Sequence, residues 1–180
     1  PQQVKMAVEL AQNALQQPQA QETTGPTMYA NRNNRFALCS LLAKTYLEQI
    51  IQPHGHQLTQ TQKQQLITDL ERTVHDIEQI FGSGQEPQVI KWKGMLELAR
   101  GNRQQAVKQL YTAYEQFSAS GKRDSYLAYR LAKIFENTNE LGAANEFYAH
   151  ALALQNRNAR DKIDTQRPST LLDYAQLLIQ

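Results

Sequence analysis

The chain has 180 residues and a formal net charge of +2, with 41% hydrophobic and 20% charged residues. This balance is typical of a folded domain and excludes a disordered tail. The weak net charge disfavours nucleic-acid binding, which usually gathers Lys and Arg on one face. No apolar run approaches the roughly 18–20 residues that cross a bilayer, so we expect no membrane insertion.

Cysteine content and the first residues bear on the compartment. Cys39 is the only cysteine, so an internal disulfide and a cysteine-only metal site are excluded. One cysteine suits either redox environment, which leaves the localisation unknown, with the cytoplasm slightly favoured. The sequence begins with Pro1 and shows no targeting signal. We therefore expect a piece of a longer protein that lacks the native N-terminus.

The first half of the chain contains three stretches with helical periodicity. Apolar residues on one stripe predict a helix over residues 4–17, which Pro18 ends. A longer helix is expected over residues 33–51, with Asn33 or Asn34 as its N-cap. The next begins after Thr59 or Thr61 and ends before Gly82, where glycine can take the left-handed conformation.

The second half reads as a helix–turn–helix segment followed by a similar copy. The first helix of the first copy begins near Pro87, and its turn is Gly101-Asn102. The second copy turns at residues 137–140. Each second helix carries a small, a bulky and a small residue at steps of four and three, which places them on one face: Ala106, Leu110 and Ala113, then Ala144, Tyr148 and Ala151. Pro168 and Ser169 begin a final helix.

These stretches amount to about eight helices and no strand. Short connections predict antiparallel neighbours. We expect a single domain over residues 1–180, made of a half hairpin (4–17), three full hairpins (33–81, 86–120 and 123–155) and a last half hairpin (168–180).

The pattern resembles the tetratricopeptide repeat, in which first helices carry a large residue, Leu, a small residue and an aromatic residue at steps of three, one and three. Three sets match: Ala128, Leu131, Ala132 and Phe135; Cys39, Leu42, Ala43 and Tyr46; and Leu171, Tyr174, Ala175 and Leu178. The resemblance implies an all-α, right-handed superhelix of stacked helix pairs. An unrelated helical bundle is the alternative.

The chain departs from the tetratricopeptide pattern in two respects, the distance between successive repeats and the alignment of the repeat near Trp92. The small residues Ala43, Gly94, Ala132 and Ala175 are 51, 38 and 43 residues apart, longer than the repeat of about 34 residues. Near Trp92 two registers remain open. The turn favours Gly94 in the small position, whereas Trp92 in the aromatic position brings Met95, Leu96 and Ala99 onto the packed face.

No motif for catalysis or for metal binding emerges from the histidines. His54 and His56 share a loop without further ligands nearby, which favours an exposed turn over half of a metal site. His75 and Glu78 share one helix face, which favours a solvated polar surface, and His150 is expected at the surface.

The remaining candidates for chemistry are equally weak. Cys39 falls at a packing position, where a buried cysteine behaves as a small hydrophobe. The Gly82-Ser83-Gly84 segment is too short for a phosphate-binding loop and does not follow a strand. We therefore expect that the chain is not an enzyme and that it binds no cofactor and no metal ion.

In the superhelix that the resemblance implies, the first helix of each hairpin lines a concave face. The resemblance implies that this face binds an extended or helical peptide. The residues that correspond to groove positions, with Arg130 beside them, are Ser40, Lys44, Lys91, Met95, Tyr129, Lys133, Leu172 and Gln176. The three lysines favour an acidic or C-terminal peptide. Ordinary solvated lysines are the alternative.

The sequence thus predicts a protein–protein interaction or scaffold module that docks a peptide or a partner domain. One alternative is a regulatory or accessory helical region of a larger enzyme or assembly. Another is self-association, in which the end helices form a homodimer, because the half hairpins leave apolar faces at both ends. No residue pattern points to a small-molecule pocket.

Overall fold

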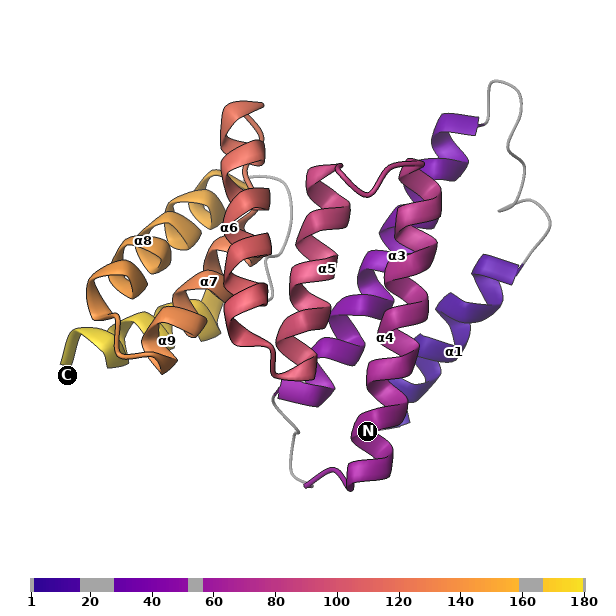
Figure 1. Ribbon diagram of the computed structural model, residues 1–180, viewed down its shortest axis with the longest axis horizontal. Helices are drawn as coiled ribbons and strands as arrows, with labels where there is room; N and C mark the ends of the chain where they lie inside the picture. Colours follow the sequence, from indigo (N-terminus) through magenta and orange to yellow (C-terminus); the bar gives the residue numbers. More distant parts are fainter. Residues whose placement is uncertain (1, 17–27, 52–56, 159–166, 180) are drawn as a thin grey trace. The chain divides into compact units, whose positions relative to one another are not determined.

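The computed structural model describes residues 2–16, 28–51, 57–158 and 167–179, and every regular element within these ranges is an α-helix (Figure 1). The predicted all-α class is therefore confirmed. The chain divides into two compact units, residues 1–102 and 103–180. Their helices are α1 (Gln2–Gln16), α3 (Met28–Ile51), α4 (Gln60–Phe81) and α5 (Pro87–Arg100), then α6 (Arg103–Ala119), α7 (Ser125–Asn137), α8 (Leu141–Asn158) and α9 (Arg167–Ile179).

Unit 1 is built around the packing of α3 on α4 within the predicted hairpin 33–81, with α5 against both and α1 against α3 (Figure 1). The apolar stripes of α3 and α4 face each other, as the 3.6-residue period requires. Their fully or nearly fully buried side chains are Cys39, Leu42, Ala43, Tyr46 and Leu47 from α3, and Leu70, Val74 and Ile77 from α4. The predicted packing set on α3 is therefore buried as expected.

The ends of α4 follow the local rules of the sequence. Thr59 forms a capping box: its hydroxyl accepts from the backbone N–H of Gln62 at 3.2 Å, and Gln62 Oε1 accepts from Thr59 N–H at 2.9 Å. Gly82 ends the helix with φ of 68°, in the left-handed region. Both predicted boundaries are confirmed.

The predicted start of α3 is wrong. The helix begins at Met28, so Asn33 and Asn34 lie inside it and neither is an N-cap. Both side chains are exposed, where an Asn inside a helix costs only a few tenths of a kcal/mol more than a strong helix former. An asparagine is therefore tolerated inside the helix when its side-chain amide can hydrogen-bond to water.

Burial favours one of the two registers of α5. Trp92, Met95, Leu96 and Ala99 are all at most 6% exposed, which is the set brought inward by placing Trp92 in the aromatic position. Gly94 is buried as well. A helix with buried residues on so many sides behaves as a core helix rather than as an amphipathic surface helix.

Unit 2 contains α6, α7, α8 and α9, with α7 and α8 packed together within the predicted hairpin 123–155. Asp124 caps α7 by accepting from Leu127 N–H at 3.0 Å. The turn into α8 places Asn139 at φ of 60°, a conformation that asparagine adopts more readily than most residues. The predicted packing positions are fully buried: Ala106, Leu110, Ala113, Ala128, Leu131, Ala132, Ala144, Tyr148 and Ala151. Phe135 is half-buried and stacks on Phe147.

The predicted packing face of α9 is wrong by one residue. Of the four residues that the resemblance placed inward, Leu171, Ala175 and Leu178 are exposed, and only Tyr174 is half-buried. The buried residues are Thr170 and Leu177, each one position earlier. A shift of one residue turns a helix by about 100°, so it moves a whole stripe from inside to outside.

Polar contacts explain this rotation of α9. Tyr129 of α7 donates to Asp173 at 2.8 Å, and Tyr174 donates to Asn145 of α8 at 2.8 Å. The Tyr174 ring also stacks on Tyr148, with centroids 5.7 Å apart. These contacts orient residues 173 and 174 toward the neighbouring helices, and the leucines then turn outward.

The boundary between the units falls after Asn102, inside the predicted hairpin 86–120. Helices α5 and α6 consequently belong to different units. That hairpin, the single domain and the right-handed superhelix stay predictions.

Core packing predicts a steep contrast between two leucines of unit 1. Leu70 is 0% exposed and Leu41 is 53% exposed. We expect Leu70→Ala to lower the free energy of unfolding by about 2–5 kcal/mol, because it leaves a cavity, and Leu41→Ala by no more than about 0.5 kcal/mol. Chemical unfolding followed by circular dichroism measures both. Equal effects would contradict the assigned core.

Candidate functional site

The predicted groove residues of unit 1 differ in accessibility. Ser40 and Lys44 on α3 are half-buried. Lys91 and Met95 on α5 are only 6% and 0% exposed. The Lys91 ammonium lies 5.0 Å from the centroid of the Trp92 ring, within cation–π distance. Met95 therefore acts as a core residue, and Lys91 is engaged within its own helix.

The predicted groove residues of unit 2 fall into two groups. Tyr129 and Arg130 on α7 are 3% and 2% exposed, whereas Leu172 and Gln176 on α9 are exposed. The Arg130 guanidinium lies 5.1 Å from the Tyr126 ring centroid and 5.4 Å from that of Tyr129. Arg130 thus lies between aromatic rings, as weakly hydrated guanidinium groups often do.

Tyr129 and Lys133 are brought together on a carboxylate of α9. Tyr129 donates to Asp173 Oδ2 at 2.8 Å, and the Lys133 ammonium lies 3.7 Å from Asp173 Oδ1. The same ammonium is 2.8 Å from Glu136 Oε2, which also accepts from the Tyr148 hydroxyl at 2.7 Å. The network joins α7, α8 and α9 through two carboxylates, two phenols and one lysine.

The pKa values of Glu136 and Tyr148 are shifted in opposite directions within this network. Burial by itself would raise the pKa of Glu136, but hydrogen bonds from Lys133 and Tyr148 and the lysine charge outweigh burial, so the pKa is lowered. The pKa of Tyr148 is raised, first by burial and then by its bond to Glu136. Glu136 is therefore ionised and Tyr148 protonated.

A cavity of about 430 Å³ in unit 1 was not predicted from the sequence. Three helices converge on it: α1 supplies amides and a leucine, α3 an arginine, the cysteine, a leucine and a tyrosine, and α4 two carboxylates, an arginine and a threonine. The lining residues are Gln12, Leu15, Gln16, Arg35, Cys39, Leu42, Tyr46, Asp69, Arg72, Thr73 and Asp76. Its volume is in the usual range of ligand-binding pockets.

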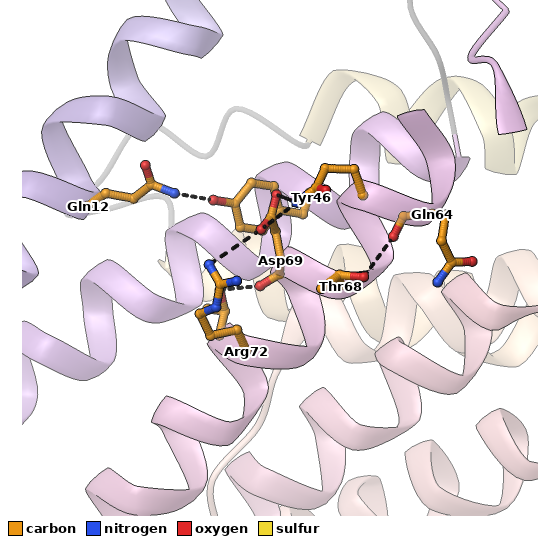
Figure 2. Close-up of polar contacts among 8 residues, drawn as sticks. Gln12, Tyr46, Gln64, Thr68, Asp69 and Arg72 are labelled. Atoms are coloured by element: carbon orange, nitrogen blue, oxygen red, sulfur yellow. Dashed lines mark hydrogen bonds and ion pairs between the residues drawn. The ribbon is translucent and has the colours of Figure 1, made fainter. Parts of the chain in front are cut away.

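Figure 2 shows polar contacts of four residues that line this cavity, Gln12, Tyr46, Asp69 and Arg72. Gln12 extends from α1 and donates to the Tyr46 hydroxyl at 2.9 Å. Below it, Arg72 lies 3.6 Å from Asp69, one helical turn away on α4. Asp69 also accepts from Gln65 at 3.2 and 3.3 Å. Burial, followed by the Asp69 charge, raises the pKa of Tyr46, so its phenol stays protonated.

A weak signal of the cavity existed in the sequence. On α4, Asp69, Thr73 and Asp76 each precede a buried apolar residue by one position, so they border the packed stripe. On α3, Arg35 stands four residues before Cys39 and shares its face. Helix periodicity places each group on a face, but it does not show that the two faces meet.

The other residues considered for chemistry behave as expected where the structure describes them. His75 and His150 are exposed, and His150 Nδ1 lies 2.7 Å from the Tyr114 hydroxyl. Cys39 is 1% exposed, and burial, then the Asp76 charge, raise the pKa of its thiol to about 11. Such a thiol is protonated at neutral pH and is a poor nucleophile. His54 and His56 lie outside the described residues.

No group of three or more His, Cys, Asp or Glu side chains within the described ranges is arranged to hold a metal ion. None of the helices described combines the length and the apolar character needed to cross a membrane.

No protein-family model matches the chain, and no curated protein or solved structure is detectably similar to it.

The Glu136 network predicts a pH dependence of stability. Because the folded-state pKa of Glu136 is lowered, its contribution is present above the unfolded pKa of about 4.3 and is lost as the pH falls through the folded value. We expect Glu136→Gln to lower the unfolding midpoint at pH 7, with the difference from the native chain shrinking toward pH 3.

Thermal unfolding by circular dichroism across this range measures the effect. The exposed Glu115 of α6 supplies the matched control, Glu115→Gln. A difference that stays constant with pH, or one equal to that of the control, would show that Glu136 makes no such contribution.

Proposed function

We propose that this chain is a non-catalytic protein–protein interaction module, a divergent tetratricopeptide-like region that docks an acidic peptide or partner segment. The observation that carries the proposal is the seating of Asp173 on Tyr129 and Lys133. These two side chains occupy positions where the resemblance implies peptide binding. In the structure, Tyr129 and Lys133 of α7 bind the carboxylate of Asp173, which belongs to α9.

The geometry at Asp173 suits exchange with another carboxylate. The phenol of Tyr129 donates a short hydrogen bond, and the Lys133 ammonium adds charge from 3.7 Å. Lys133 and Asp173 keep 24% and 19% of their side chains exposed, so solvent and a partner reach them. The Lys133–Asp173 ion pair is partly exposed and contributes little stability, about 0–1 kcal/mol, so an acidic partner would compete with Asp173 for Lys133 first.

Two substitutions of opposite expected effect test this role. A short fluorescent peptide of alternating Glu and Ala is titrated against the whole chain by anisotropy, at low and at high salt. We expect Lys133→Ala to weaken binding several-fold, and Asp173→Asn to strengthen it, because the internal competitor loses its charge. Raising the salt should weaken binding, since screening acts on the charges involved.

The matched control is Lys108→Ala, which removes an exposed lysine of α6. Binding that ignores salt, or that responds equally to Lys108→Ala and Lys133→Ala, removes the proposal. Weaker binding by Asp173→Asn also counts against it, because Asp173 would then support the site and not compete for it.

Self-association is a second candidate, favoured by the outward leucines of α9. Leu171, Leu172 and Leu178 are 47%, 59% and 65% exposed and share one side of the helix with Ala175. Contiguous exposed apolar surface marks interaction sites more often than scattered leucines do. A second copy of the chain would cover this stripe.

Light scattering over a range of concentrations tests the second candidate. We expect the mean mass to rise with concentration and Leu172→Glu to suppress the rise, since a carboxylate is costly to bury. Gln176→Glu, on the same helix, is the control for added charge. A mass that equals the monomer at all concentrations would reject self-association.

A further inference from the structure

Four charged side chains line the cavity between α1, α3 and α4, and they are unequally partnered. Asp69 and Arg72 form an ion pair at 3.6 Å, and Asp69 also accepts from Gln65. Arg35 is different: its Nε atom is buried and has no hydrogen-bond partner within the part of the chain that the structure describes. Because that atom is closed to solvent, a ligand in the cavity would meet the terminal N–H groups of Arg35.

The chemistry of Arg35 selects a carboxylate. The two terminal nitrogens of a guanidinium present N–H groups side by side, which matches the two oxygens of a carboxylate. Arg35 and Cys39 are four residues apart on the same face of α3, and both line the cavity. A carboxylate entering the cavity would therefore meet Arg35 beside the buried thiol.

Asp76 favours a positive charge on the ligand, whereas Arg35 favours a negative one. It lines the cavity from α4, and its charge acts on Cys39 together with that of Arg35. The charges of Asp69 and Arg72 offset each other. The cavity wall therefore carries one further positive charge, on Arg35, and one further negative charge, on Asp76. A purely anionic ligand would meet repulsion from Asp76, whereas a ligand with both charges would not.

We propose that this cavity binds an amphoteric ligand, whose carboxylate is held by Arg35 and whose ammonium or guanidinium is held by Asp76. Gln12 and Tyr46 offer further hydrogen-bonding groups, and Leu15 and Leu42 supply apolar contact. A volume of about 430 Å³ accommodates a free amino acid or a pair of charged side chains on a peptide. The site lies wholly in unit 1 and is independent of the docking role proposed for unit 2.

The test observes the arginine Nε–H signals of the whole, ¹⁵N-labelled chain by NMR. The probes are L-glutamine, which is zwitterionic, N-acetyl-L-glutamine, which keeps only the carboxylate, and L-glutamine amide, which keeps only the ammonium. A capped Glu-Ala-Ala-Lys peptide carries both charges on side chains. We expect the Arg35 signal to shift with a probe that carries both charges, and about tenfold weaker binding of the singly charged probes.

Variants decide which groups hold the ligand. Arg35→Gln and Asp76→Asn should each weaken binding about tenfold or more. The matched control is Arg32→Gln, the same change one turn earlier on α3, outside the cavity lining, and it should leave affinity within about twofold. Circular dichroism verifies helix content, and Asp76→Asn, which preserves size, decides the matter if Arg35→Gln unfolds.

The outcomes separate the sources of the ligand. Binding of L-glutamine indicates a free amino acid, and binding of the capped peptide alone indicates a peptide segment. The proposal is overturned if neither binds, if N-acetyl-L-glutamine binds as tightly, or if Arg32→Gln weakens binding as much as Arg35→Gln. Lys133→Ala should leave this binding unchanged, so failure here is distinct from failure of the acidic-peptide site.

Discussion

Close approach of helices through small side chains is the constraint on which this structure depends. A single amphipathic helix cannot shelter its own apolar stripe, and it gains stability only against a neighbour. Ala144 and Ala151 are fully buried and flank the fully buried Tyr148 in α8. Alanine lets the backbones approach, and the larger residue fills the space that remains. The same arrangement recurs around Leu110 in α6.

Large aromatic residues at such positions bring polar atoms into the packed layer, and those atoms need partners. The Tyr148 hydroxyl finds Glu136, and the Tyr129 hydroxyl finds Asp173. Satisfying them fixes the rotation of α9 and turns its leucines outward. Packing, polar pairing and the exposed apolar stripe are thus consequences of the same aromatic positions, which links the two functions proposed for unit 2.

Local sequence rules predicted much of the fold. The capping box at Thr59 and the left-handed Gly82 need only neighbours along the chain. The rules failed where distant groups decide, as in the rotation of α9, which depends on Tyr129 and Asn145. The unit 1 cavity was missed for the same reason, because Arg35 and Asp76 belong to separate helices. Of the groove residues, the sequence paired Tyr129 with Lys133 but did not foresee Asp173.

The solitary thiol of unit 1 gives this protein a built-in reporter. Cys39 lies where α3 meets α4, and at neutral pH almost all of it is in the unreactive protonated form. Alkylating reagents therefore modify it slowly in the closed unit, and faster when those helices separate and hydration restores an ordinary thiol. The modification rate then measures how often unit 1 opens, without any engineered label.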